Sequence, residues 1–261
     1  MFKHETQVIK FLLQWYSMNA RKLPWRKKNN LNLPHPYFVF VSEYMLQQTT
    51  VNTVKNKFNE FILKWPSLNK LAQTSEPNIL KFWSGLGYYS RARNLLKSAK
   101  IIKNNFKNNI PQTYDELIQL PGIGDYTAKA ILGIGYNKSV MPLDANIERI
   151  LVRLHAIDKP INKVKNKLKD LGKKFISDKY SSNLIQSFMD YGSEICLPRN
   201  PKCNICGINK FCQSYKKNLQ QKIPLKLKKK TTKPIKYTRA YVIVNEKNEI
   251  LVRSRPNKGM L

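Results

Sequence analysis

Hydrophobic residues recur every three or four positions along most of this chain. Such apolar faces occur in residues 8–15, 51–62, 147–157 and 182–195, and this spacing predicts amphipathic helices. Little of the sequence before residue 236 alternates with the period of a β-strand. The pattern therefore predicts a mainly helical protein up to about residue 215.

One helix start is also marked by its capping residues. Thr113 is placed to cap a helix, and Glu116 follows three residues later, as in a capping box. We expect a helix to begin there.

The pattern changes after residue 215. Residues 216–236 hold nine lysines, two prolines and no acidic residue, which predicts an extended linker near phosphate, or else a solvated tail. In residues 237–261, the segment "RAYVIVNEKNEILVRSR" predicts two β-strands around the turn Glu246–Glu249. Two strands alone are marginally stable, so we expect these residues to open a β-rich domain.

The composition of the chain indicates a class of binding partner. The 261 residues suffice for one large domain or two modest ones. Lys and Arg total 47 against 16 Asp and Glu, a net charge of +31. A nucleic acid fits that charge, because binding to phosphates releases counterions, although a codon bias toward Lys, Asn and Ile would also raise it. No secretion signal and no apolar run of about 18 residues occur, which predicts a cytosolic protein with reduced thiols and no membrane span.

All four cysteines fall in one short segment. They are Cys196, Cys203, Cys206 and Cys212. Reduced thiols argue against disulfides, and zinc sites usually combine two short pairs, whereas only one short pair occurs here. Four thiolates from one compact loop suit an iron–sulfur cluster better, with zinc and unligated thiols as alternatives. Arg199 and Lys202 would make this a basic loop that meets DNA, unless the metal only staples a short segment.

Two glycines and two carboxylates stand out in the helical part. Gly122 and Gly124 lie between two helical patterns, where backbone N–H groups would cradle a phosphate, although an ordinary turn uses the same residues. Asp144 stands at the start of a helix and would serve as its N-cap or as a catalytic anion. Glu43 lies among apolar helical neighbours, where it would face a helix dipole or, with its pKa raised by desolvation, donate a proton.

Five motifs occur in one order along the chain: "SEYMLQQT", "GLGYYSRARNL", "LPGIGDYTAKAIL", "PLDANIERIL" and the cysteine loop. Together they resemble the MutY family of adenine DNA glycosylases, within the endonuclease III superfamily, over residues 5–215. The resemblance implies an all-α fold of two lobes. Residues 26–149 would form a six-helix domain with the helix-hairpin-helix, and residues 1–25 and 150–215 a domain whose four cysteines hold a 4Fe–4S cluster beside DNA.

The same resemblance implies a reaction. Family members excise adenine mispaired with 8-oxoguanine, or with guanine, from double-stranded DNA, and we expect a monomer. Glu43 would protonate a ring nitrogen of the base, and Asp144 would stabilise the oxocarbenium-like sugar. Tyr126 and Asn146 match positions that orient these groups. Lyase members of the superfamily carry a lysine at the position of Tyr126, so a monofunctional glycosylase is expected.

Further positions would contact the DNA. Gln48 and Tyr88 match residues that wedge into the duplex around the mispair, and the hairpin would grip the backbone without reading sequence. Trp25 and Arg26 would line the adenine pocket, or else be a surface aromatic and a stray charge. The implied setting is a cytoplasmic, nucleoid-associated bacterial repair protein.

Two features depart from the family pattern. Ala145 stands where the family usually has glycine, which would be harmful only if the backbone there requires a positive φ. Residues 237–261 match only the start of the family's Nudix-like domain, so a truncated domain is expected. We expect adenine excision to survive and the preference for 8-oxoguanine over guanine to weaken.

Three rival interpretations remain. An endonuclease III-like glycosylase and lyase for oxidised pyrimidines conflicts with Tyr126. A catalytically dead DNA-binding relic would be expected to lose an acid, yet Glu43 and Asp144 are both present. A zinc-stapled nucleic-acid module would be colourless, whereas an iron–sulfur cluster absorbs visible light.

Overall fold

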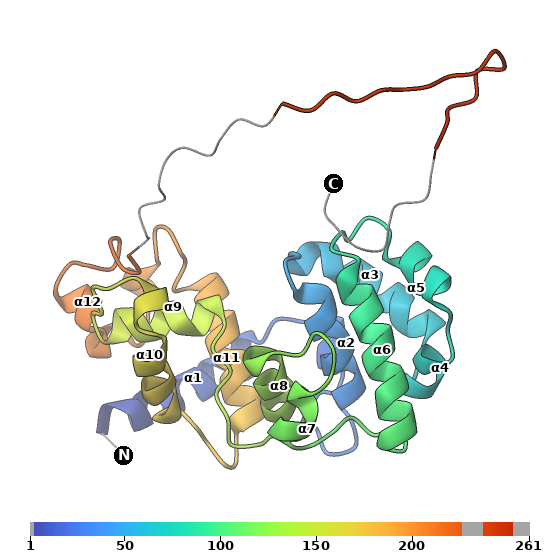
Figure 1. Ribbon diagram of the computed structural model, residues 1–261. Coiled ribbons are helices and arrows are strands. Elements are labelled where there is room, and N and C mark those ends of the chain that lie inside the picture. Colours follow the sequence, from blue (N-terminus) through green and yellow to red (C-terminus); the bar gives the residue numbers. More distant parts are fainter. Residues whose placement is uncertain (1–2, 226–236, 253–261) are drawn as a thin grey trace. The chain divides into compact units, whose positions relative to one another are not determined.

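The computed structural model describes residues 3–225 and 237–252. The chain divides into two units, residues 1–226 and residues 227–261, which are described separately. The first unit is mostly helical (Figure 1), so the predicted all-α class is confirmed. Within the described ranges, no helix combines the length and hydrophobicity needed to cross a membrane.

Five helices from the first half of the chain pack together (Figure 1). They are α2 (Pro36–Leu46), α3 (Val51–Lys64), α4 (Leu68–Ala72), α5 (Glu76–Trp83) and α6 (Ser90–Asn105). Helices α2, α4 and α5 all contact α6. The buried face of α6 carries Ala92, Leu95, Ala99 and Ile102 at helical spacing. One apolar stripe of α6 therefore serves three neighbours at once.

Two short helices follow, α7 (Tyr114–Ile118) and α8 (Asp125–Ala130). Thr113 caps α7 as predicted: its hydroxyl accepts from the Glu116 N–H at 3.4 Å and donates to the Glu116 carboxylate at 2.6 Å. Helix α8 continues into a π-helical turn, Ile131–Gly135. Because this turn packs against α2 and α11, α8 is fixed beside α2.

The second group of helices includes the first helix of the chain. It comprises α1 (Lys3–Asn19), α9 (Ala145–Leu154), α10 (Lys165–Lys173), α11 (Ser181–Glu194) and α12 (Gln213–Lys216). Helix α11 is buried along most of its length because α1, α9 and the π-helical turn all pack against it. The four apolar faces expected from the sequence coincide with α1, α3, α9 and α11. The lobe boundaries near residues 25 and 149 stay predictions.

Residues 217–225, the first part of the predicted linker, pack onto the helical unit. Ile223 is only 2% exposed, and its carbonyl accepts a 2.8 Å hydrogen bond from Arg153 Nε. The rest of the predicted linker, residues 226–236, lies outside the described residues.

The second unit is described for residues 237–252. Val244 and Ile250 form a single antiparallel bridge around a turn that begins at Asn245. The two predicted strands do not extend beyond this bridge. The apolar side chains around it are exposed, and a two-stranded pair without a covered face is marginal in water. The predicted Nudix-like start continues to residue 261, and residues 253–261 lie outside the described ranges.

Candidate active site

One cavity of about 550 Å³ brings together six of the predicted site residues, including all four predicted catalytic ones. We call it the Glu43 cavity. It is lined by Glu43, Tyr126, Asp144, Asn146, Trp25 and Arg26. Its walls come from α2, α8, the start of α9, and α11, together with the 3-10 turn Pro24–Arg26. Outside its wall lie Gln48, Tyr88, Gly122, Gly124, Arg199 and Lys202.

Glu43 projects from α2 and is only 7% exposed. Burial raises its pKa to about 8, while a hydrogen bond from the Tyr126 hydroxyl opposes the rise and the charge of Asp144 adds to it. A carboxyl group with this pKa carries a proton at neutral pH and can donate it. This raised pKa is consistent with the proton-donor role, one of the two that the sequence left open, and that role stays a prediction.

Asp144 is the N-cap of α9. Its Oδ1 accepts from the Ile147 N–H at 2.7 Å, and its Oδ2 accepts from the Asn146 amide at 2.8 Å. Burial raises the pKa of Asp144, and these hydrogen bonds, with the charge of Arg149, oppose that rise. Donors at a helix N-terminus stabilise an anion. The donors gather on Asp144, so the arrangement favours the negative charge there and the proton on Glu43.

Asn146 is itself held by neighbours. Its Oδ1 accepts from Arg149 Nη2 at 2.8 Å, and the same guanidinium donates to the carbonyls of Gly192 at 2.5 Å and Cys196 at 2.7 Å. Gly192 has no room for a side chain, because an added Cβ would lie 2.5 Å from the Asn146 Cβ. Ala145 is exposed, begins α9 and does not have a positive φ. The departure from glycine at Ala145 therefore causes no backbone strain.

Trp25 and Arg26 belong to the buried wall of the cavity. The Trp25 ring meets Phe58 edge-on at 5.6 Å. Arg26 donates from both terminal nitrogens to the two oxygens of Asp190 at 2.7 Å, and Arg21 Nε donates to Asp190 at 2.6 Å. Burial disfavours charge on Asp190, but these arginines outweigh it and lower the pKa of Asp190. The alternative of a surface aromatic and a stray charge is wrong.

Sequence motifs do not single out Gln186 and Asp190. Gln186 lines the Glu43 cavity and is 2% exposed. Its Nε2 donates to the Ser182 carbonyl at 3.0 Å, whereas its Oε1 has no partner in the described part of the chain. A buried acceptor without a donor is costly, and Oε1 belongs to a residue of the cavity wall. The sequence signal that could have identified them is their spacing: Gln186 and Asp190 are polar residues four positions apart on an otherwise apolar helix face.

Gln48 and Tyr88 lie on two exposed loops, and both have a positive φ, 57° and 46°. Non-glycine residues seldom adopt this conformation. Gln47 Nε2 donates to the Gly122 carbonyl at 3.2 Å, which ties the first loop to the turn between α7 and α8. Gly122 has a φ of 82° and needs to be glycine. Gly124 has a φ of −104° and open space around it, so its missing side chain only leaves its backbone accessible.

The four cysteines line a single small cavity of about 30 Å³. Tyr191 donates to Cys206 Sγ at 3.2 Å, and Arg153 Nη1 donates to Cys196 Sγ at 3.3 Å. Among the residues that the structure describes, no three His, Cys, Asp or Glu side chains form a group that could hold a metal ion. A cubane cluster needs thiols around a volume rather than around one point. Four thiols that line one cavity are compatible with the predicted cluster, which stays a prediction.

Arg199 and Lys202 are exposed on the loop between the first two cysteines. The Lys202 N–H donates to the Ile195 carbonyl at 2.9 Å, which anchors the end of this loop. Their contact with DNA stays a prediction.

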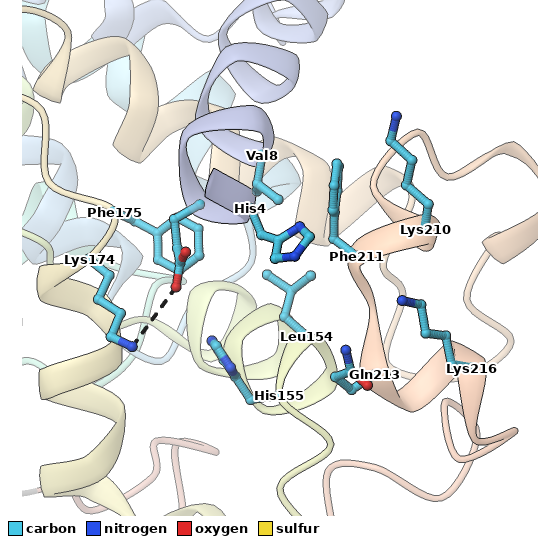
Figure 2. Close-up of a pocket in the computed structure, with 11 residues that line it drawn as sticks. His4, Val8, Leu154, His155, Lys174, Phe175, Lys210, Phe211, Gln213 and Lys216 are labelled. Atoms are coloured by element: carbon cyan, nitrogen blue, oxygen red, sulfur yellow. Dashed lines mark ion pairs between the residues drawn. The ribbon is translucent and has the colours of Figure 1, made fainter. Parts of the chain in front are cut away.

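A second cavity, of about 300 Å³, lies between the start of α1, the ends of α9 and α10, and the cysteine loop (Figure 2). We call it the Glu5 cavity. Glu5 is 7% exposed, and its Oε1 lies 3.9 Å from Lys174 Nζ. In the described residues, Glu5 Oε2 and His155 Nε2 have no hydrogen-bond partner. None of the predicted site residues lines this cavity.

Comparisons with known proteins identify the family and the fold of this chain. A family model described as HhH-GPD superfamily base excision DNA repair protein matches residues 41–174. An adenine DNA glycosylase of Buchnera aphidicola subsp. Baizongia pistaciae is 42% identical over 252 residues, which cover 95% of this chain and 70% of that protein. The structure of a thermostable thymine-DNA glycosylase matches with a TM-score of 0.74 at 26% identity, over 82% of this chain and 98% of that one. A non-covalent endonuclease III–DNA complex matches with a TM-score of 0.65 at 19% identity, over 84% of this chain and 100% of that one, and shows a shared fold.

Proposed function

The chain belongs to the HhH-GPD superfamily of base excision DNA repair proteins and, within it, to the adenine DNA glycosylases, and from this premise we propose that it excises adenine mispaired with 8-oxoguanine or guanine. It is a DNA glycosylase, an enzyme that hydrolyses N-glycosyl bonds. The observation that carries the finer proposal is the pair of carboxyl groups in the Glu43 cavity: burial raises the pKa of Glu43 to about 8, and two hydrogen-bond donors hold Asp144.

Glu43 supplies the proton in this proposal. A pKa of about 8 keeps it protonated at neutral pH, and transfer to an imidazole ring nitrogen turns adenine into a neutral leaving group. General acid catalysis of this kind typically contributes about 10²–10⁴-fold. Tyr126, hydrogen-bonded to Glu43, orients the carboxyl group.

Asp144 faces the sugar in this proposal. As the glycosidic bond breaks, positive charge develops on the deoxyribose ring, and an anion fixed at the α9 N-terminus stabilises it. Asn146 holds the Asp144 carboxylate in place through its 2.8 Å hydrogen bond. Water then completes the hydrolysis.

Gln186 gives the cavity a means to select adenine. The exocyclic amine of adenine is a donor, and the unpartnered Gln186 Oε1 is a buried acceptor. Guanine would present a carbonyl oxygen at the equivalent ring position, which leaves two acceptors facing each other. The buried Trp25 and the fixed Arg26 complete the wall.

Among the described residues, no lysine lines the Glu43 cavity to supply the amine that a lyase step requires. The lysine nearest in sequence to Tyr126 is Lys129, whose Nζ pairs with Asp125 at 2.8 Å. Lys129 lines a different cavity. This supports excision without strand cleavage, and it disfavours the endonuclease III-like alternative.

The DNA partner is a duplex whose adenine has left the stack, since no base reaches a buried carboxyl group from inside the helix. Gln48 and Tyr88 would fill the gap and contact the orphaned base. The turn with Gly122 and Gly124 would hold the backbone, and Arg199 and Lys202 would contact phosphates.

The cysteine cavity would hold a 4Fe–4S cluster through Cys196, Cys203, Cys206 and Cys212. Such a cluster would fix the loop that carries Arg199 and Lys202. The Arg149 guanidinium contacts both the Cys196 carbonyl and Asn146, so the loop and the catalytic residues share one support.

Single-turnover adenine release tests this proposal. The substrates are duplexes with adenine opposite 8-oxoguanine, guanine or, as a control, thymine, each analysed with and without alkali. We expect free adenine from the two mispairs and strand breaks only after alkali. Breaks without alkali would establish a lyase, and intact binding without release would establish a DNA-binding relic.

A further inference from the structure

Arg91, in the first turn of α6, is a buried arginine with an unusual set of partners. It is 5% exposed, and its hydrogen bonds all run to main-chain carbonyls. Nη1 donates to Met45 at 2.7 Å and, at close range, to Gln47. Nη2 donates to Leu86 at 2.9 Å and Gly87 at 3.1 Å. One guanidinium therefore joins the end of α2 to the loop between α5 and α6.

The carbonyls that Arg91 holds directly precede the two left-handed residues. Gln47 is followed by Gln48, with a φ of 57°, and Gly87 is followed by Tyr88, with a φ of 46°. The φ angle of a residue sets the rotation of the peptide unit before it. By holding the Gln47 and Gly87 carbonyls, Arg91 therefore fixes the peptide units that precede Gln48 and Tyr88, and with them the directions of these two side chains.

These conformations need outside support. A non-glycine residue in the left-handed region costs on the order of 1–3 kcal/mol and persists only where surrounding structure enforces it. Tyr88 is 63% exposed, so packing of its own side chain does not enforce its backbone. The guanidinium also lies 5.6 Å from the Tyr88 ring and 5.5 Å from the Trp83 ring.

Lysine could not replace Arg91 in this arrangement. A guanidinium presents several N–H donors in one rigid plane, whereas an ammonium is a point charge on a flexible stem. The plane spans carbonyls from two loops at once. Arg93, two residues further along the same helix, instead makes a surface ion pair with Glu76 at 2.8 Å.

We propose that Arg91 is a positioning residue for base extrusion: it sets the separation and direction of Gln48 and Tyr88 so that both enter the duplex together. This inference rests on the proposed function, because Gln48 and Tyr88 are wedge residues only if the protein extrudes a base. Arg91 touches neither the base nor the sugar. Its loss is expected to slow extrusion and to leave cleavage of the glycosidic bond unchanged.

The test compares Arg91→Lys with the matched control Arg93→Lys on two substrates. One carries adenine opposite guanine, with 2-aminopurine as the neighbouring base to report unstacking by fluorescence. The other carries adenine in a single-base bulge, which is extruded without displacing a partner. We expect Arg91→Lys to slow single-turnover adenine release from the mispair by about 10–100-fold and to abolish the fluorescence rise. Release from the bulge should slow by less than about 3-fold. Arg93→Lys should match the wild-type protein on both.

A double-mutant cycle separates positioning from general damage to the fold. If Arg91 acts through the wedge residues, Arg91→Lys should add little further loss once Gln48 and Tyr88 are both alanine. Equal losses on both substrates, additive losses in the cycle, or wild-type behaviour of Arg91→Lys would each overturn the inference.

Failure of the proposed function gives a different pattern. If the wild-type protein releases no adenine but still raises the fluorescence, the proposed function fails, and loss of that rise in Arg91→Lys still supports the positioning role. If the wild-type protein neither releases adenine nor raises the fluorescence, both fail.

Discussion

The Glu43 cavity and the Glu5 cavity each contain a glutamate that is 7% exposed. Their surroundings are opposite in charge. Glu43 has an acid, Asp144, and a phenol, Tyr126, as its interacting neighbours, whereas Glu5 has Lys174 at 3.9 Å and a lining that includes two more lysines. Equal burial therefore does not imply equal chemistry. At Glu43, burial is the main cause of the raised pKa, the charge of Asp144 adds to it, and no lysine of the described residues lines the cavity to oppose it.

Replacing the two glutamates should give the largest contrast. Glu43→Gln removes the transferable proton but keeps the volume and hydrogen-bonding shape, so single-turnover adenine release should fall by about 10²–10⁴-fold. Glu5→Gln should change the rate by less than about twofold. A comparable loss of rate in both variants would show that burial alone, and not the proximity of Asp144 and Tyr126, defines the site.

Asp144→Asn tests the other partner in the Glu43 cavity. It removes the anion that faces the developing positive charge, and adenine release should fall by about 10²–10³-fold. DNA binding, measured by a shift in mobility or anisotropy, should remain. A matched control is Glu148→Gln, which changes a partly buried acid on the same helix, outside the cavity wall, and should keep the rate.

The pH dependence of release should report the protonation of Glu43. The active form carries the proton, so the rate should fall about tenfold per pH unit above a pH of about 8. Glu5→Gln should keep the same profile. A rate that rises with pH through this range would mean that Glu43 acts as a base.

The smallest effect concerns stability. The pKa of Glu43 is about 8 in the folded protein against an ordinary 4.5, so the folded state binds a proton that the unfolded state releases between these values. Stability from this group is therefore present below pH 4.5 and lost as pH rises toward 8. Glu43→Gln should stabilise the fold by on the order of 1–3 kcal/mol at pH 9 and much less at pH 5.

Urea unfolding of the two variants checks this prediction. Glu5→Gln weakens a 3.9 Å contact with the partly exposed Lys174, so its effect should stay below about 1 kcal/mol at both pH values. If Glu43→Gln instead destabilises the protein at pH 9, ionised Glu43 does not cost the folded state the free energy assigned to it.

Much of the helical unit follows from local signals. The apolar spacing predicts α1, α3, α9 and α11, and the Thr113–Glu116 pair predicts the start of α7. These features depend on residues three or four positions apart, which a sequence displays directly. The paired strands near residue 246 were overestimated, because a strand depends on a covering layer that local alternation does not reveal.

The site divides in the same way. Glu43 and Asp144 stand out because an acid among apolar residues and an acid before a helix are visible locally. Gln186 and Asp190 acquire their roles from the Glu43 cavity and from Arg26, which lies 164 residues away from Asp190 in sequence. Arg91 lies in a recognised motif, yet its carbonyl partners come from two loops. Such roles depend on tertiary contacts and not on spacing.

The left-handed backbone at Gln48 and Tyr88 has a consequence for protein engineering. A redesign that optimises thermal stability would favour glycine or asparagine at both positions, because these residues relax the strain. The resulting enzyme would tolerate heat better and would have lost the side chains proposed to open the duplex. A thermostable version of this glycosylase should therefore be selected with positions 48 and 88 held fixed.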